Sequence, residues 1–201
     1  MVTNVWDERY QGCEYHFGTE PNAFLASNQE WLKPGMSCLA VADGEGRNGV
    51  WLAEQGLHVL SVDNSSVAVA KARALAARRD VEMQCELVDL MQWDWPENHF
   101  DVVAGIFIQF AAPLQRAQLF ANLKRCLKPG GLLMLQGYTP RQLEYRTGGP
   151  SQLENLYSEA MLCEAFSDME ILHLSEHDDI IDEGAGHSGM SALIDLVARQ
   201  V

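Results

Sequence analysis

The stretch LAVADGEGRN, residues 39–48, decides the fold of this chain of 201 residues. An apolar run enters the stretch, two glycines follow one residue apart, and a helix-forming segment, 49–55, leaves it. This order predicts a strand, a tight turn and a helix N-terminus. Because glycine has no Cβ, a ligand can approach the backbone of such a turn closely, and the N–H groups of the helix favour an anionic or carboxylate-bearing ligand. We therefore expect a nucleotide-like cofactor here.

Two cofactor classes fit this turn. Gly44, Gly46 and Gly49 spell G-x-G-x-x-G, and Asp63 follows about 20 residues later, as a dinucleotide site requires. That pattern predicts an NAD(P)-dependent oxidoreductase. Alternatively, Ala42, Gly44 and Gly46 fit the glycine turn of a methyltransferase, with alanine in place of the first glycine. The turn alone leaves both classes open, so the rest of the chain has to distinguish them.

The composition is that of an ordinary globular protein, with 47% hydrophobic and 21% charged residues. The 14 basic residues are outnumbered by 28 acidic ones, which gives a formal net charge of -14. Such a charge opposes binding to a phosphate backbone, and the sequence holds no basic run that would offset it. We therefore expect no nucleic-acid partner.

The five cysteines are scattered and include no C-x-x-C pair, so neither a metal site nor a disulfide framework is expected. This pattern fits a reducing cytoplasm. The first residues are too polar for a signal peptide, and no apolar stretch approaches the roughly 20 residues that cross a membrane. The sequence predicts a cytoplasmic protein without a membrane partner.

Apolar segments alternate with amphipathic ones along the chain, which predicts an α/β fold. The expected architecture is a doubly wound, mostly parallel sheet with its ligand at the carboxyl ends of the strands. We expect a single domain over 1–201. The expected strands are 36–41, 57–62, 81–88, 100–107, 132–136, 169–175 and 191–198.

Residue spacing adds two expectations about individual elements. A helix is expected to begin at Pro113 and to bury one face, because apolar residues recur there at intervals of three and four. The expected buried residues of this helix are Leu114, Ala117, Phe120, Leu123 and Leu127. Between the last two strands, 176–183 is expected to form an acidic loop.

Four segments carry a resemblance to a known family. They are ADGEGRNGVWLAEQGLHVLSVDNS at 42–65, VDL at 88–90, FDVVAGIF at 100–107 and LKPGGLLML at 127–135. With these segments the chain resembles the class I S-adenosylmethionine-dependent methyltransferases. The whole chain, including its opening at 6–25, is similar to small bacterial members close to the tellurite-resistance and thiopurine methyltransferases. The resemblance implies a Rossmann-like sheet of seven strands with an antiparallel C-terminal hairpin, S-adenosylmethionine as cofactor and a small-molecule substrate.

Other features favour this class over a nicotinamide enzyme. Asp89 stands where the resemblance implies an acidic contact to the adenine amine, the last two strands suit the closing hairpin, and no Tyr-x-x-x-Lys pair is present. Two residues depart from the family pattern: Ala40 replaces an acidic residue and Ala42 replaces the first glycine. The loss at Ala40 weakens the contact to the cofactor's ammonium group, which Asp43 or Glu45 could supply instead. A non-enzymatic module that binds S-adenosylmethionine therefore stays open as an alternative.

The resemblance also implies which residues surround the cofactor. The methionine end would be lined by Asp43, Gly44, Glu45, Gly46 and Arg47. The ribose would be lined by Asp63 and Asn64, and the adenine by Asp89 and Leu90. The sulfonium would be lined by Ile106 and Gln109, and the top of the site by Arg9, Tyr10 and Tyr15. The N-terminal segment 1–22 would form a flap, and 139–150 would form a substrate cover.

Methyl transfer from a sulfonium is an in-line displacement. Positioning alone contributes about 7–11 kcal/mol to such a step, so no catalytic triad is required. The end of the fourth strand lacks the Asn/Asp-Pro-Pro-aromatic motif used on nucleic-acid or amide nitrogens, which agrees with a small diffusible substrate. We hypothesise that the acceptor is a thiol or a reduced selenium or tellurium species. The candidate catalytic residues are His187, Glu183 and Tyr145, and a purely structural His187 is the alternative.

Overall fold

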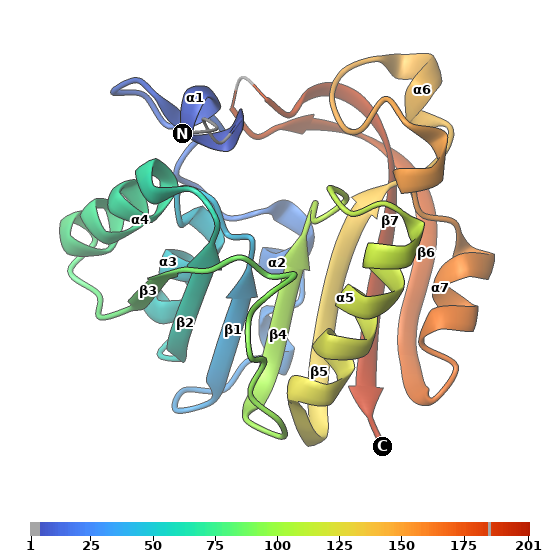
Figure 1. The fold of residues 1–201 in the computed structure, drawn as a ribbon, viewed down its shortest axis with the longest axis horizontal. Helices are drawn as coiled ribbons and strands as arrows, with labels where there is room; N and C mark the ends of the chain where they lie inside the picture. Colours follow the sequence, from blue (N-terminus) through green and yellow to red (C-terminus); the bar gives the residue numbers. More distant parts are fainter. Residues whose placement is uncertain (1–4, 185) are drawn as a thin grey trace. The chain divides into compact units, whose positions relative to one another are not determined.

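The computed structural model describes residues 5–184 and 186–201, and these form two compact units (Figure 1). Unit 1 contains the described residues of Met1–Trp93 and of Glu183–Gly186. Unit 2 contains Asp94–Asp182 and His187–Val201. The expectation of one domain over 1–201 stays a prediction.

Unit 1 holds three parallel strands and the helices between them. Its strands are β1 (Ser37–Val41), β2 (His58–Asp63) and β3 (Gln84–Leu87), and β2 pairs with both of the others. Its helices are α1 (Val5–Tyr10), α2 (Ala23–Ser27), the 3-10 helix η1 (Gln29–Trp31), α3 (Arg47–Glu54) and α4 (Ser66–Arg78). β1 is apolar and buried from Cys38 to Val41, as expected for a central strand with both faces covered.

Two helices of unit 1 begin directly after the carboxyl ends of two strands. α3 follows β1 through the glycine turn, and its N-cap residue, Gly46, has a left-handed backbone. α4 follows β2, and the Oγ of its N-cap residue, Ser65, accepts a hydrogen bond from the N–H of Ala68 at 3.1 Å. This bond satisfies one of the free N–H groups at the N-terminus of α4.

Unit 2 holds four strands. Its strands are β4 (Phe100–Ile106), β5 (Leu127–Tyr138), β6 (Met169–Asp182) and β7 (Ser188–Gln200). β4 and β5 are parallel, whereas β7 is antiparallel to both β5 and β6. Its helices are α5 (Pro113–Cys126), α6 (Gln142–Tyr145), the 3-10 helix η2 (Leu153–Asn155) and α7 (Glu159–Ala165). β6 and β7 form a long hairpin, visible in orange and red in Figure 1.

The strands form a seven-stranded sheet in the order β3-β2-β1-β4-β5-β7-β6. The chain passes outward from the middle of this order twice, first from β1 to β3 and then from β4 to β6, and β7 is antiparallel to both of its neighbours. The predicted fold class, a doubly wound and mostly parallel α/β sheet with an antiparallel C-terminal hairpin, is confirmed. In the described part of the chain, no helix combines the length and the apolarity needed to cross a membrane.

The expected acidic loop at 176–183 is wrong. Residues 176–182 continue β6, which pairs with β7 as far as Asp182 and Ser188. β6 is the last strand in the order, and most of its side chains are exposed or half-buried. An edge strand is held by backbone hydrogen bonds to one neighbour, so it tolerates acidic side chains that a central strand would exclude.

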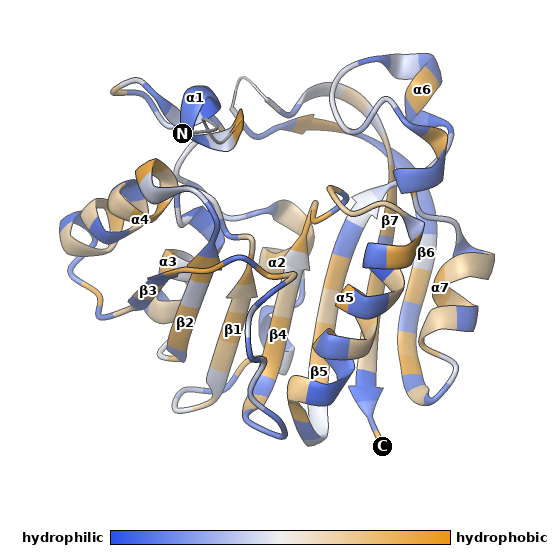
Figure 2. Cartoon of the chain, in the orientation of Figure 1, coloured by the Kyte–Doolittle hydropathy of each residue, from blue (hydrophilic) through white to orange (hydrophobic). Residues whose placement is uncertain are grey.

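The expected buried face of α5 is partly wrong. Leu114 is 90% exposed and Ala117 is also exposed, whereas Phe120 and Leu123 are buried as predicted. The buried face is completed by Leu119 and Cys126, and Leu127 belongs to β5. Two stripes with helical spacing overlap in this sequence, and spacing alone cannot select between them. Figure 2 shows that hydrophilic and hydrophobic residues are interspersed along α5.

Candidate functional site

The turn between β1 and α3 has the special backbone that its sequence predicts. Ala42, Gly44 and Gly46 all have positive φ values, 48, 58 and 89 degrees. At Gly46 an added Cβ would lie 2.6 Å from the Cβ of Ala72, so α4 leaves no room for a side chain there. Ala42 adopts the left-handed region despite its Cβ, at a cost of about 1–2 kcal/mol. The turn is thus a strained backbone segment that its surroundings hold in place.

Asp63, the last residue of β2, holds this turn. Its Oδ2 accepts a hydrogen bond from the N–H of Gly44 at 2.9 Å, and its Oδ1 accepts one from the N–H of Ser65 at 2.9 Å. The carboxylate is buried, and burial raises its pKa despite these hydrogen bonds. One side chain therefore connects the carboxyl ends of β1 and β2, where a ligand of this fold is expected. Its predicted contact to a ribose stays a prediction.

Asp43 is bonded to the protein through its carboxylate. Oδ2 accepts a hydrogen bond from the Ser61 hydroxyl at 2.8 Å, and both oxygens lie 3.2 Å from the N–H of Gly49, which donates to them. Desolvation raises the pKa of Asp43 to about 7. This acid therefore changes its charge close to neutral pH, inside the turn that was predicted to bind the cofactor.

Glu45 joins the turn to the N-terminal segment. Its Oε2 accepts a hydrogen bond from the N–H of His16 at 2.6 Å, and its Oε1 lies 2.7 Å from the ammonium of Lys71 on α4. The side chain is 3% exposed. Because both carboxylate oxygens have protein partners, Glu45 fastens the N-terminal segment over the turn.

Arg47, the first residue of α3, belongs to a second buried network. Its Nη2 lies 2.5 Å from Oε2 of Glu183. The other oxygen of Glu183 accepts hydrogen bonds from Nδ2 of Asn22 at 2.9 Å and from the N–H of Ala23 at 3.2 Å. The N–H of Asn22 donates to Oδ1 of Asn48 at 2.9 Å. Four polar side chains are thus buried together, and Asn22 and Asn48 were not among the residues predicted from the sequence.

One nitrogen of this network has no partner among the described residues. The Nη1 of Arg47 is buried and makes no hydrogen bond there. A buried guanidinium nitrogen left unpaired costs free energy, so a ligand that accepts its hydrogen bond is favoured. An anionic group such as the carboxylate of an amino-acid moiety fits this donor, which agrees with the predicted place of Arg47 at the methionine end of a cofactor.

The residues predicted to close the top of the site lie on or near α1 and make contacts within unit 1. The Tyr10 hydroxyl would be 2.8 Å from a Cβ built on Gly44, so this buried phenol lies directly on the turn. The Tyr15 hydroxyl donates to the Lys71 carbonyl at 3.0 Å. Arg9 is exposed, and its guanidinium lies 4.7 Å from the centre of the Trp6 ring.

The predicted adenine and ribose residues lie after β2 and β3. Asn64 is exposed and Leu90 is buried. Asp89 is exposed, and its carboxylate accepts hydrogen bonds from the N–H of Met91 at 3.0 Å and from Nε2 of Gln92 at 2.6 Å. These bonds shape the loop after β3, so Asp89 has a structural role whatever it binds.

In unit 2 the residues predicted near the sulfonium follow β4. Ile106 ends the strand and is buried. Gln109 is bonded to the backbone of Tyr138: its Oε1 accepts from the N–H at 2.6 Å and its Nε2 donates to the carbonyl at 2.9 Å. Gln109 therefore acts as a clamp that joins the segment after β4 to the end of β5.

Three aromatic rings gather at the carboxyl ends of β4 and β5. Phe107 has a φ of 56 degrees, which is rare for an aromatic residue. Its ring stacks on Tyr138 with centroids 4.7 Å apart and meets the His187 ring edge-on at 4.3 Å. The Tyr138 hydroxyl lies 3.2 Å from Nδ1 of His187. Tyr138 and Phe107 were not predicted as site residues, because an isolated aromatic residue carries no signal for such a role in the sequence.

The three predicted catalytic residues have separate partners. His187 contacts Tyr138 and Phe107 in unit 2, whereas Glu183 belongs to the Arg47 network of unit 1. The Tyr145 hydroxyl donates to Oδ2 of Asp178 at 2.9 Å. A catalytic role for any of the three stays a prediction. Within the described ranges, no group of three or more His, Cys, Asp or Glu side chains is arranged to hold a metal ion.

The predicted cover at 139–150 packs on the β6–β7 hairpin. Nε2 of Gln142 donates to Thr147 within this segment at 3.0 Å, and Oε1 of Gln142 accepts from the N–H of Ala192 at 2.8 Å. Thr147 donates to the carbonyl of Met190 at 2.5 Å. The segment is therefore tied to β7, and its role as a substrate cover stays a prediction.

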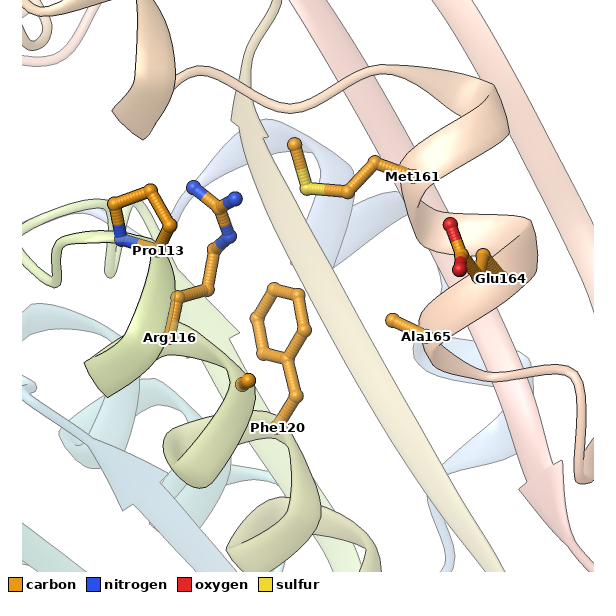
Figure 3. A pocket seen from close by; sticks show the side chains of 7 residues that line it. Pro113, Arg116, Phe120, Met161, Glu164 and Ala165 are labelled. Atoms are coloured by element: carbon orange, nitrogen blue, oxygen red, sulfur yellow. The ribbon is translucent and has the colours of Figure 1, made fainter.

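A shallow pocket of about 230 Å³ lies between α5 and α7. Figure 3 shows Arg116 and Phe120 of α5 facing Met161 and Ala165 of α7 across it. None of the residues predicted to bind the cofactor or to act in catalysis lines this pocket. The predicted site and this pocket are therefore built from different residues.

Comparison with known proteins gives a family match, a curated relative and similar solved structures. The model of a family described as "Methyltransferase domain" matches residues 38–131. A sterol 24-C-methyltransferase from Gibberella zeae is 27% identical over an alignment that covers 88% of this chain and 51% of that protein. The chain spans about half the length of the curated relatives it matches.

Solved structures with this fold include TehB from Haemophilus influenzae, with a TM-score of 0.73 and 19% identity over 90% of this chain and 62% of that one. A SAM-dependent methyltransferase from Methanosarcina mazei has a TM-score of 0.72 and 16% identity over 90% of this chain and 99% of that one. These two likenesses concern the fold, and they agree with the strand order described above.

Proposed function

We propose that this chain, which carries a class I S-adenosylmethionine-dependent methyltransferase domain, transfers a methyl group to a small-molecule acceptor. The family match confirms the predicted resemblance and, with it, the predicted cofactor. When bound, S-adenosylmethionine supplies the methyl group from its sulfonium. Because the chain spans about half of its curated relatives, the activity of the whole protein is part of this proposal.

The observation that carries the proposal is the glycine turn of unit 1. Three left-handed residues shape the turn between β1 and α3, and Asp63 fixes the turn through the N–H of Gly44. The unpaired Nη1 of Arg47 supplies a buried donor to an anionic group beside the same turn. This combination suits a ligand with a carboxylate at one end, as the methionine part of the cofactor has.

The acceptor is the finer part of the proposal. We propose a small soft nucleophile, a thiol or a reduced selenium or tellurium species, that reacts with the help of His187. The formal net charge of -14 supports a small acceptor over a nucleic acid. The aromatic surroundings of His187 support an acceptor that does not need strong hydration.

The proposal extends to the setting of the protein. We propose that it works in the cytoplasm without a membrane partner. The five cysteines, all in the described part of the chain, form no disulfide bonds, which suits a reducing compartment.

A second candidate is a non-enzymatic module that binds S-adenosylmethionine. It is favoured by one observation: position 40 at the end of β1 is a buried alanine, where the family pattern has an acidic side chain. Such a module would bind the cofactor through the same turn, so cofactor binding alone does not separate the two candidates.

Turnover separates them. Purified protein is incubated with S-adenosylmethionine and a panel of acceptors that includes thiols, selenite with a reductant, tellurite with a reductant, amines and carboxylates. Formation of S-adenosylhomocysteine above the no-acceptor control with at least one small molecule is the expected result. Tight cofactor binding without turnover across the panel would favour the binding module. Turnover confined to amines would contradict the proposed thiol, selenium or tellurium acceptor.

A further inference from the structure

The end of β5 holds Tyr138 more firmly than a surface tyrosine would be held. The N–H of Tyr138 donates to Oε1 of Gln109 at 2.6 Å, and the carbonyl of Tyr138 accepts from Nε2 of Gln109 at 2.9 Å. Phe107 stacks on one part of the ring, and a Cβ built on Gly149 would lie 2.6 Å from the Tyr138 ring. Gly149 has a φ of 81 degrees, so this close approach depends on glycine in both respects. The Tyr138 side chain is 1% exposed.

The Tyr138 hydroxyl meets one particular nitrogen of His187. Oη lies 3.2 Å from Nδ1, and the imidazole is 8% exposed. A phenol with an ordinary pKa of about 10 is a good hydrogen-bond donor, and the unprotonated nitrogen of an imidazole, whose protonated form has an ordinary pKa of about 6.5, is a good acceptor. These properties favour donation from the hydroxyl to Nδ1. A neutral histidine whose Nδ1 accepts a hydrogen bond carries its proton on Nε2.

We propose that Tyr138 is a positioning residue that holds His187 in the orientation and tautomer in which Nε2 carries the proton. This inference rests on the proposed function and deepens it. Neutral His187 then offers an N–H donor at Nε2 and has no lone pair there with which to take a proton. It orients and stabilises an acceptor that is already an anion, such as a thiolate or selenolate, and it does not act as the general base.

Phe107 gives the arrangement its rigidity. An aromatic residue with a φ of 56 degrees has a strained backbone, and such strain persists only where the surroundings hold it. Here the strained backbone places the Phe107 ring against both Tyr138 and His187. The three side chains therefore pack together as one cluster, in which the His187 ring has little freedom to flip.

Nitrogen–proton NMR of histidine-labelled protein tests the proposal without reference to activity. The spectrum is recorded at about pH 8, above the ordinary histidine pKa of about 6.5, and the His187 signals are assigned by their absence in His187→Gln. The expected result is the tautomer protonated at Nε2. Tyr138→Phe keeps the ring and removes the hydroxyl, so the signals should move toward a mixture of both tautomers. Tyr157→Phe is the matched control, because that buried hydroxyl has no hydrogen-bond partner in the described chain.

A His187 that is protonated at Nδ1 in the unmodified protein would overturn the proposal, whether or not Tyr138→Phe folds. An unchanged His187 spectrum in folded Tyr138→Phe would do the same. In turnover assays Tyr138→Phe should lower kcat roughly three- to tenfold with an unchanged KM for S-adenosylmethionine, as expected for one lost hydrogen bond. If no acceptor is methylated at all, the proposed function fails while the NMR result stands on its own.

Discussion

Gly46 is the residue at which the turn, α3 and α4 meet. Its φ of 89 degrees is left-handed, and an added Cβ would lie 2.6 Å from the Cβ of Ala72. Gly35 has the same φ, but nothing lies within 4 Å of its added Cβ. We expect Gly35→Ala to cost about 1–2 kcal/mol of unfolding free energy from backbone strain alone. Gly46→Ala should cost clearly more and should also weaken cofactor binding.

Urea unfolding and calorimetry with S-adenosylhomocysteine measure both effects for the Gly46→Ala and Gly35→Ala pair. If both variants are destabilised equally and Gly46→Ala still binds S-adenosylhomocysteine as the parent does, then the contact with α4 does not exclude a side chain at position 46.

Asp63 is expected to support the cofactor site through the turn. Asp63→Ala removes the acceptor of the Gly44 and Ser65 N–H groups, and each hydrogen bond to a charged group contributes about 1.5–3 kcal/mol. We predict that S-adenosylhomocysteine binds roughly ten- to a hundredfold more weakly to this variant, measured by calorimetry. Ser65→Ala is the control, because it removes the α4 cap but keeps the bond to Gly44. The same affinity in Asp63→Ala and the parent protein would reduce Asp63 to a residue of the α4 terminus.

Asp43 predicts a pH dependence of stability. Burial raises its pKa from 3.8 to about 7, so the folded protein keeps this proton to a higher pH than the unfolded chain does. The stabilisation from this group is complete below about pH 4 and is lost as the pH rises toward about 7. Asp43→Asn imitates the protonated acid and should remove this loss. The unfolding free energy of the variant, relative to the parent, should therefore rise between those pH values. Urea unfolding at a series of pH values measures it, and a constant difference between the two proteins would contradict the raised pKa of Asp43.

At the scale of elements, residues 16–23 near the N-terminus are bonded to other parts of unit 1. Glu45 bonds the backbone of His16, and Glu183 bonds Asn22 and Ala23 while pairing with Arg47. The packing is equally close, because a Cβ on Gly184 would lie 2.6 Å from the backbone N of Gly18. The segment was predicted as a flap, and the structure adds the residues that any opening would have to release.

Glu183→Gln should loosen this segment. The variant leaves the buried Arg47 charge without its counter-ion, and removal of one partner of a buried pair costs about 3–5 kcal/mol. Urea unfolding should show this loss, and limited proteolysis should cut within 5–22 faster than in the parent protein. Glu20→Gln is the control: its pair with Arg79 is exposed, and such pairs contribute about 0–1 kcal/mol. Similar effects of the two variants would mean that the Arg47–Glu183 pair does not hold the segment.

The sequence predicts those parts of the molecule that local rules govern. The turn at 42–46 and the strand before it depend on residues within a few positions of each other. The Arg47–Glu183 pair joins residues 136 positions apart, and no local rule relates them. The role of Tyr138 likewise requires the pairing of β5 with β7 before His187 comes near it. The extension of β6 through acidic residues was missed because its stability comes from the partner strand and not from its own side chains.

At the scale of the whole molecule, charge and fold limit the partners. An acidic chain with a pI near 4.7 repels polyanions at neutral pH, so tight binding to nucleic acid is not expected. The mostly parallel sheet places the ends of β1 and β2 beside the glycine turn, where this fold binds its ligand. The central claim is therefore about which cofactor the turn accepts.

Calorimetric titration of the whole chain with S-adenosylhomocysteine and, separately, with NAD tests that claim most directly. The account predicts a saturable signal with one site for S-adenosylhomocysteine and none for NAD, and it predicts that Gly46→Ala loses the first signal. Saturable binding of NAD together with no binding of S-adenosylhomocysteine would contradict the assignment of the site.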